Sequence, residues 1–125
     1  MDIKINDDRK IEDIQKDFSG MFPFLKLEFF VRPHKVGGGS PGSQMLRSSK
    51  TIGECRKVHK KGHLIIIPDM KVLDLEQQFQ DTYGLSAQVF RRVGKVWLET
   101  TVTDTWTLAQ QNEHGKMLST HGQTM

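Results

Sequence analysis

The sequence predicts an α+β fold, with a mixed sheet of about four strands and helices mainly on one face. Three observations predict it: apolar residues recur at helical spacing in some segments, alternate at strand spacing in others, and glycine or proline separates these segments. The predicted order is α-β-α-β-α-β-β-α. Helical crossovers favour some parallel pairing, and a hairpin supplies an antiparallel pair. We see no internal repeat, because the two strand–helix segments do not align well with each other.

The first predicted elements are a helix, a strand and a long loop. An amphipathic helix is predicted over residues 8–19 and ends at Gly20, which favours a left-handed stop. Its apolar face contains Ile11, Ile14 and Phe18. Residues 24–32 alternate as a strand does, and residues 33–50 are rich in glycine, serine and proline, which predicts a flexible loop.

The middle of the chain predicts a second helix and a second strand. Thr51 and Glu54 are spaced as a capping box, in which the hydroxyl accepts the amide three residues on and the carboxylate reaches back. This spacing predicts a helix from Thr51 to about Lys61, ended by Gly62. Residues 63–67 are mostly β-branched and continuous, which predicts a buried strand.

A third helix and a hairpin follow. The helix is predicted to begin after Asp69, which can cap it, and to end at Gly84. Its inward stripe consists of Val72, Leu75, Phe79 and Tyr83. Residues 87–92 and 95–102 then alternate around a turn at residues 93–94, which predicts a hairpin.

The C-terminal part predicts one more helix and a tail. Residues 107–110 have the spacing of a capping box, which predicts a short helix to Glu113 or His114. Residues 116–125 are polar and are predicted to fray. At 125 residues the chain has the length of one domain, so residues 1–125 are predicted to form a single α+β domain.

Composition and the N-terminal residues predict a cytoplasmic protein. The single cysteine, Cys55, excludes an internal disulfide and suits a reducing compartment. Acidic residues occur at the N-terminus, where a signal peptide has a basic region and an apolar run. The longest apolar run, residues 64–67, is far shorter than the ~20 residues that span a bilayer, so we expect no membrane partner.

Basic residues are concentrated in the middle of the chain. Residues 32–61 contain eight basic residues and one acidic residue, Glu54, although the net charge of the whole chain is only +3. Such asymmetry marks either an anion-binding face or a solvated surface. The candidate anion-binding residues are Arg32, Lys35, Arg56, Lys57 and Lys60. The segment lacks stacking aromatics and the signatures of known nucleic-acid-binding domains, so nucleic acid is a candidate partner but not the favoured one.

The glycine-rich part of the predicted loop differs from a phosphate-binding P-loop. Gly37 and Gly42 have the P-loop spacing, but Ser43 and Gln44 stand where the motif requires lysine and then serine or threonine. Pro41 also removes an amide that would bind phosphate. The sequence therefore disfavours a nucleotide triphosphatase and predicts a mobile loop.

Cys55, His59 and His63 are the residues to consider for a metal site or a nucleophile. On a continuous helix Cys55 and His59 would share a face, and His59 could act as a base for the thiol. Zinc, however, requires four protein ligands, or three and a water. Gly62 ends the predicted helix before His63, and Cys55 lies on its core side. The sequence therefore predicts no metal, no cofactor and no catalytic residue.

The two tryptophans suggest a ligand pocket. If Val96 and Leu98 face the core, Trp97 points to the other face of the sheet together with Glu99. Trp97, Glu99 and Trp106 are therefore the candidate lining of a pocket for a small polar ligand. The favoured alternative is that Trp106 or the C-terminal helix covers Trp97 as a minor core, because a domain of this size needs the buried aromatic area.

Three short motifs carry a resemblance. Residues 84–91 are GLSAQVFR, residues 97–101 are WLETT, and residues 104–108 are DTWTL. Together with residues 22–25, FPFL, these motifs resemble a group of small uncharacterised bacterial proteins. The resemblance implies a compact bacterial α+β domain. No activity is established for that group, so the resemblance transfers no site residue.

The sequence predicts a non-enzymatic binding or protein-interaction domain, because it contains no complete catalytic constellation. A homodimer formed through an exposed strand edge is one such interaction. The first alternative is an anion or nucleic-acid binder that uses residues 32–61. The second is a small enzyme whose site lies near Glu99 and Asp104, two carboxylates that could act as an acid–base pair.

Overall fold

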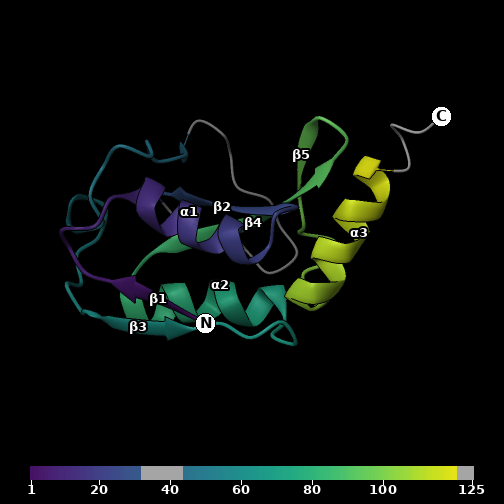
Figure 1. Ribbon diagram of the computed structural model, residues 1–125. Helices are drawn as coiled ribbons and strands as arrows, with labels where there is room; N and C mark the ends of the chain where they lie inside the picture. Colours follow the sequence, from purple (N-terminus) through teal and green to yellow (C-terminus); the bar gives the residue numbers. More distant parts are fainter. Residues whose placement is uncertain (32–43, 121–125) are drawn as a thin grey trace.

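The computed structural model describes residues 1–31 and 44–120, which form three helices and five strands (Figure 1). In chain order the elements are β1 (Asp2–Ile5), α1 (Ile11–Met21), β2 (Leu25–Phe30), the 3-10 turn η2 (Gly53–Cys55), β3 (Gly62–Ile65), α2 (Val72–Tyr83), β4 (Ser86–Val93), β5 (Val96–Glu99) and α3 (Leu108–Thr120). The predicted α+β class is confirmed.

The strands form two antiparallel sheets, where the sequence predicted one mixed sheet. β1 pairs with β3, and β2, β4 and β5 form a three-stranded sheet in the order β2-β4-β5. The sequence analysis did not predict β1. Because β3 pairs with β1, β3 lies in a separate two-stranded sheet and not beside β2, β4 and β5. α1 and α2 therefore each connect a strand of the smaller sheet to a strand of the larger one.

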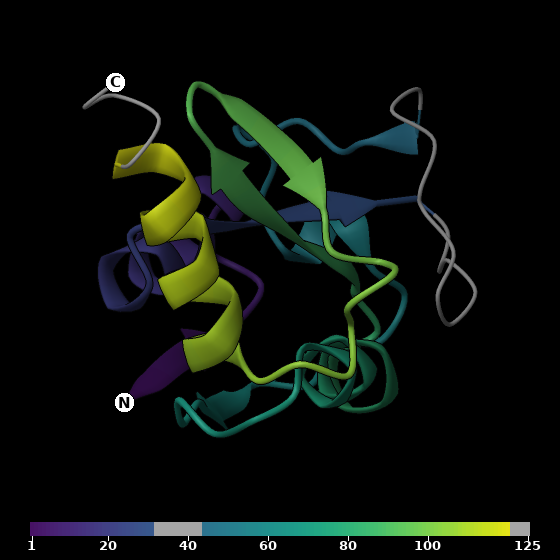
Figure 2. The same cartoon turned by 90° about the vertical axis from the view of Figure 1, so that its right-hand side faces the viewer.

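The core lies between the two sheets and the first two helices. α1 packs against β2 and β1, α2 packs against β4, and α3 packs against β4 and β2 (Figures 1 and 2). The largest side chains that are fully buried in this core are Phe18, Phe29 and Phe79, and the rings of Phe29 and Phe79 meet edge to face with centroids 5.3 Å apart. This core fixes the orientation of the three-stranded sheet.

The structure reveals an internal repeat that the sequence did not show. The segments β1-α1-β2 and β3-α2-β4 have the same element order, and each strand pairs with its counterpart, β1 with β3 and β2 with β4. Both of these pairings are antiparallel, so the two halves are joined in the same way at each sheet. The prediction of no repeat is therefore wrong, because only a few of the shared positions, such as Phe18 and Phe79, keep the same residue.

The start of each helix is held by the same backbone contacts in both halves. In each half, the residue before the helix forms an isolated antiparallel β-bridge with a threonine: Lys10 with Thr51, and Lys71 with Thr107. The hydrogen bonds that flank the bridges are Ile11 N to Lys50 O (2.9 Å), Ile52 N to Arg9 O (2.7 Å), Val72 N to Trp106 O (3.0 Å) and Leu108 N to Met70 O (2.8 Å). The repeat therefore extends beyond the strands and helices into the loops.

The helix predicted from Thr51 to about Lys61 is wrong. The Thr51 hydroxyl accepts the Glu54 amide as predicted, at 3.3 Å, but only the 3-10 turn η2 forms. Arg56 is extended because its buried guanidinium reaches Asp7, and Asp7 O also accepts the Gly53 amide. This tertiary contact replaces the continuation of the helix.

Three smaller differences concern the strands and the C-terminus. β3 exposes Ile65, whereas the sequence predicted a buried strand, because β3 belongs to a two-stranded sheet with an open side. α3 extends to Thr120, so residues 116–120 of the predicted tail are helical, and residues 121–125 lie outside the described residues. Of the predicted loop, residues 32–43, which include the glycine-rich segment, also lie outside them. Within the described part of the chain, no helix is long and apolar enough to cross a membrane.

Candidate functional site

The β4–β5 hairpin is a braced, projecting element (Figure 2). Its two-residue turn, Gly94-Lys95, needs the positive φ of 63° that Gly94 adopts. The Ser119 hydroxyl of α3 accepts the Gly94 amide at 3.1 Å and donates to Arg92 O at 3.3 Å. α3 therefore holds the turn in place, and β5 is presented on a rigid support.

β5 is the edge strand of the three-stranded sheet, and the described residues provide no strand beyond it. Val93 and Val96 flank the turn as a pair, and the Thr100 amide donates to Val89 O at 3.3 Å. Because hydrogen-bonded pairs alternate along an antiparallel ladder, Leu98 bonds to β4, while the amides and carbonyls of Trp97 and Glu99 face outward. We call this row of outward backbone groups the β5 edge.

One face of β5 is apolar and exposed. The side chain of Val96 is 57% exposed and that of Leu98 is 45% exposed. As the sequence interpretation assumed, both side chains point to the core side of the sheet, since the register places them on the same face as the buried Leu27 and Val89. They share a face with Arg91 of β4, where α3 covers the sheet, but they lie on the outer strand. Exposed apolar side chains beside a free strand edge are typical of strands that accept a partner.

The opposite face of the hairpin carries a cation between two aromatic rings. The Lys26 ammonium lies 5.1 Å from the centroid of the Trp97 ring and 5.3 Å from that of Phe90. It also forms an ion pair with Glu28, at 3.8 Å. Burial raises the pKa of Glu28, and the charge of Lys26 and the hydrogen bond from Gln15 act in the opposite direction. Trp97 is thus held by neighbours on its own sheet.

Trp106 lies on the other face of the sheet, so the structure does not bring the three candidate pocket residues together. Trp97 is paired with Arg92, whereas the neighbouring Arg91, which points to the opposite face, places its guanidinium 6.0 Å from the Trp106 ring. Trp106 also meets His114 edge to face, with centroids 5.4 Å apart. It lines an open groove of about 340 Å³ with Gln110, Glu113, His114 and Met117.

The two carboxylates considered for an enzyme site differ in environment. Glu99 is exposed at the end of β5, whereas Asp104 is buried, with 5% of its surface exposed. The Asp104 carbonyl accepts the Leu73 amide at 2.8 Å, at the start of α2. Asp104 therefore lies in the segment that holds the second helix.

Of the candidate anion-binding residues, Arg56 is occupied within the fold. Its guanidinium donates to Asp7 Oδ1 at 2.9 and 3.1 Å and to Tyr83 O at 3.1 Å. Partial burial of Asp7 acts to raise its pKa, but hydrogen bonds and charges from Arg56 and His59 outweigh it, so the pKa lies below its ordinary value. Arg56 therefore joins η2 to the first half of the chain.

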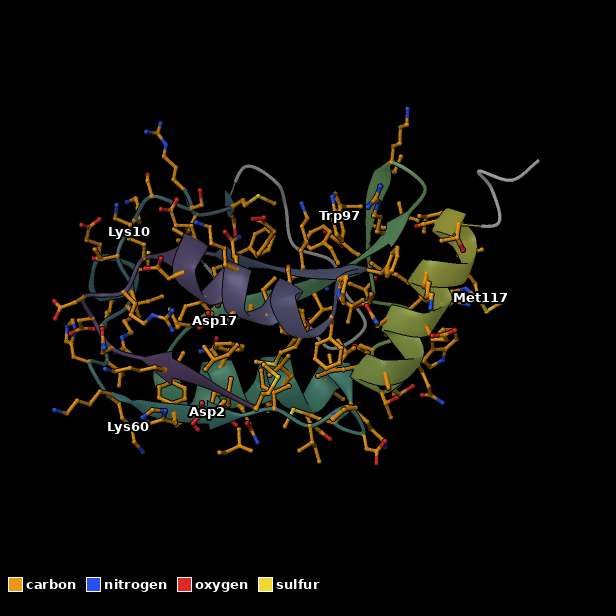
Figure 3. The ribbon with its side chains drawn as sticks, in the orientation of Figure 1. Asp2, Lys10, Asp17, Lys60, Trp97 and Met117 are labelled. Carbon is orange, nitrogen blue, oxygen red and sulfur yellow. The ribbon has the colours of Figure 1, made fainter. Side chains whose placement is uncertain are left out.

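Lys57 and Lys60 are exposed, and Arg32 and Lys35 lie outside the described residues. Lys57 lines an open groove of about 480 Å³ beside Cys55, Arg56 and Gln80. Figure 3 places Lys60 at the opposite end of the molecule from Trp97 and Met117. The basic segment and the hairpin are therefore two separate surfaces.

Cys55, His59 and His63 do not converge on a common point. His59 Nδ1 lies 2.7 Å from Asp7 Oδ2, and His63 Nδ1 lies 3.2 Å from Asp2 Oδ2. Burial raises the pKa of the Cys55 thiol, and the nearby charge of Lys50 acts to lower it. Over residues 1–31 and 44–120, no group of three or more histidine, cysteine, aspartate or glutamate side chains is arranged to hold a metal ion.

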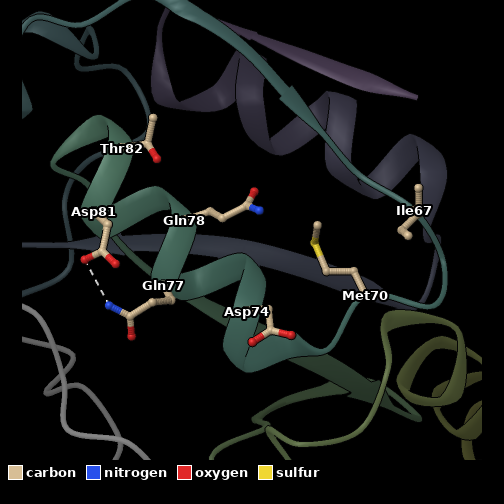
Figure 4. Close-up of a pocket in the computed structure, with 7 residues that line it drawn as sticks. All are labelled: Ile67, Met70, Asp74, Gln77, Gln78, Asp81 and Thr82. Atoms are coloured by element: carbon tan, nitrogen blue, oxygen red, sulfur yellow. Dashed lines mark hydrogen bonds between the residues drawn. The ribbon is translucent and has the colours of Figure 1, made fainter.

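An open groove along α2 was not predicted from the sequence (Figure 4). It has a volume of about 530 Å³, and its polar lining comes from the outer face of the helix. The lining residues are Ile67, Met70, Asp74, Gln77, Gln78, Asp81 and Thr82. Gln77 Nε2 donates to Asp81 Oδ1 at 3.0 Å. The only sequence signal for it is the polar face of an amphipathic helix, which most surface helices share.

Comparisons of the chain with protein-family models, with curated proteins and with solved structures give no match. No site residue is therefore transferred to this chain from a relative.

Proposed function

We propose that this protein is a non-enzymatic protein-interaction domain that binds an extended segment of a partner by pairing it with the β5 edge. The observation that carries the proposal is an exposed edge strand whose outward backbone groups lie beside two exposed apolar side chains, Val96 and Leu98. In strand addition, backbone hydrogen bonds provide affinity and alternate side chains provide specificity.

The support of the hairpin favours binding at this edge. Arg92 donates from Nε to Gly94 O at 2.8 Å, and Ser119 bonds Gly94 of the turn and Arg92 of β4. A strand that is already ordered loses little conformational entropy when a partner pairs with it. Two charged residues, Lys95 in the turn before β5 and Glu99 at its end, limit unselective pairing, as in other protected edge strands.

The test is a peptide selection with a backbone-blocked variant. Random short peptides are selected for binding to the wild-type protein and then measured against Glu99→Pro and Glu99→Ala. Proline removes the outward amide of residue 99 and is tolerated where that amide faces solvent. Alanine removes the same carboxylate and keeps the amide. We expect the selected peptides to lose binding to Glu99→Pro and to keep it with Glu99→Ala. Peptides that bind both variants equally, or no selected peptides at all, would contradict the proposal.

A second candidate function is anion or nucleic-acid binding by the basic segment. The exposed Lys57, Lys60 and Lys61 form no ion pair with any residue that the structure describes. Contacts of this kind give affinity that decreases linearly with the logarithm of the salt concentration. Fluorescence anisotropy of labelled DNA and RNA over a salt series checks this. Binding that vanishes in Lys57→Glu/Lys60→Glu supports it, and no binding at low salt rejects it.

A further inference from the structure

We infer that the partner which the β5 edge accepts is a second copy of this chain, paired antiparallel about a two-fold axis at Trp97. This inference rests on the proposed function and makes it specific. The two three-stranded sheets would join edge to edge into one continuous sheet, which is a common closed, isologous form of homodimer.

The backbone limits the registers that two β5 strands can adopt. The outward groups belong to Trp97 and Glu99, so an antiparallel partner must place its own outward residues opposite them. For two copies, the two-fold axis can then lie at any residue of β5, from Val96 to Glu99. The backbone alone does not choose among these four positions.

Two charges, Lys95 in the turn before β5 and Glu99 at the end of β5, favour one register. With the axis at Trp97, Lys95 lies opposite Glu99 of the partner subunit, and the reciprocal pair forms on the other side. With the axis at Glu99, the two Glu99 carboxylates face each other, which is unfavourable. With the axis at Val96 or Leu98, neither charge faces an opposite charge. Opposite charges at paired positions thus favour one register, and like charges disfavour another.

The side chains of both faces are self-complementary in this register. On one face, Trp97 lies beside Trp97 of the partner subunit, between the two Lys95–Glu99 pairs. On the other face, Val96 lies opposite Leu98 of the partner subunit, so the exposed apolar side chains of both copies cover one another. Pairs at these non-hydrogen-bonded positions have the closest side-chain contact in an antiparallel sheet.

The short strand sets the strength of the association. β5 contains four residues, so the paired area is below that of a standard stable interface, and we expect a dissociation constant on the order of 10⁻⁵ M. The dimer would therefore form at high local concentration and dissociate on dilution.

Charge exchange at Lys95 and Glu99 tests the inference. Sedimentation equilibrium measures the mass of the wild-type protein, Lys95→Glu, Glu99→Lys and the double variant from dilute solution to about 1 mM, a range that brackets the expected constant. Lys60→Glu, at the opposite end of the molecule, is the control for net charge. Circular dichroism confirms that each variant is folded.

We expect the wild-type mass to rise from 14.3 kDa toward twice that value with concentration. Each single variant should weaken the association about tenfold, because both ion pairs become like-charge pairs. The double variant should restore it, and Lys60→Glu should leave it unchanged. A wild-type protein that stays monomeric at 1 mM, or a double variant no better than the single variants, would overturn the inference. A monomer that still binds selected peptides through the β5 edge would overturn only the dimer, whereas the loss of both would reject the proposed function as well.

Discussion

The two halves of the chain share a backbone arrangement but end differently. In the first half, the bridging Thr51 leads into the three-residue turn η2, whereas in the second half the bridging Thr107 leads into the thirteen-residue helix α3. Among the described residues, which leave out 32–43, the first half has a single bridge beside β2, Phe30 to Met45, where the second half has the strand β5. β5 and α3, which have no counterpart in the described part of the first half, provide the candidate interaction surface and its support.

This comparison separates what holds the fold from what presents the surface. Counterpart residues of α1 and α2 are all fully buried: Ile11 and Val72, Ile14 and Leu75, Phe18 and Phe79. In both halves, the residue that follows the second of these buried positions bonds the strand after its helix. Gln15 of α1 donates to Leu27 O of β2 at 2.8 Å, and Glu76 of α2 accepts the Val89 amide of β4 at 2.8 Å. Core positions therefore follow the repeat, and the exposed hairpin does not.

The largest expected effect tests the equivalence of the two cores. Phe18→Ala and Phe79→Ala each remove a fully buried ring from the same position of the repeat. We expect each to lower the free energy of unfolding by about 3–5 kcal/mol, measured by urea denaturation. If one of the two variants is almost as stable as the wild type, the halves are not equivalent in the core.

The next effect breaks the symmetry at an ion pair that, among the described residues, only the first half has. Asp7 follows β1 and pairs with the buried Arg56, whereas Asp69 follows β3 and forms no ion pair within the described residues. The lowered pKa of Asp7 means that its ionised form is favoured in the folded state. Its contribution is therefore fully present above its ordinary pKa of 3.8 and is lost as the pH falls through the lowered pKa.

Accordingly, Asp7→Asn should destabilise the protein at neutral pH, and the difference from the wild type should shrink below pH 3.8. Asparagine keeps an oxygen that can accept from Arg56, so we expect a smaller loss than for the phenylalanine variants. Asp69→Asn is the matched control and should be neutral. Thermal denaturation between acidic and neutral pH checks both. A loss that is independent of pH would contradict this role of the carboxylate.

A pair of glycines gives a smaller effect that distinguishes α3 from α1. A Cβ on Gly115 would lie 3.0 Å from Arg91 Cγ, 3.0 Å from Phe24 Cβ and 3.1 Å from Arg92 O, whereas Gly20 has nothing within 4 Å. Gly115→Ala should therefore cost about 1 kcal/mol after the gain in helix propensity. Gly20→Ala should be neutral or stabilising by up to about 1 kcal/mol. If both substitutions stabilise the protein in urea denaturation, α3 does not pack as closely on β4 as the structure shows.

Features set by neighbouring residues could be predicted from the sequence. Gly84 ends α2 with a left-handed φ of 65°, as predicted. The predicted capping box of α3 forms, since the Thr107 hydroxyl accepts the Gln110 amide at 3.1 Å and Gln110 Oε1 accepts the Thr107 amide at 2.9 Å. The hairpin turn also forms at Gly94, one residue later than predicted. These signals act over three or four residues, so the sequence contains them in full.

Features set by distant residues could not be predicted. β1 is four residues long and is stabilised by β3, which lies far along the chain. η2 ends early because Arg56 pairs with Asp7, again across a long separation. The candidate pocket of Trp97, Glu99 and Trp106 depended on which face of the sheet each residue occupies, which the register of β4 and β5 decides. Short strands, single ion pairs and sheet faces leave too little local pattern for a sequence to specify them.

Amide hydrogen exchange of β5 at low and high protein concentration tests the central claim most directly. The outward amides of Trp97 and Glu99 should exchange fast in dilute solution and slow markedly as the concentration rises, because pairing with a second copy would protect them. The Leu98 amide, which bonds to β4, should be protected at both concentrations and serves as the internal control. If the exchange of Trp97 and Glu99 does not change with concentration, the β5 edge does not pair with itself and this account of the interaction surface is wrong.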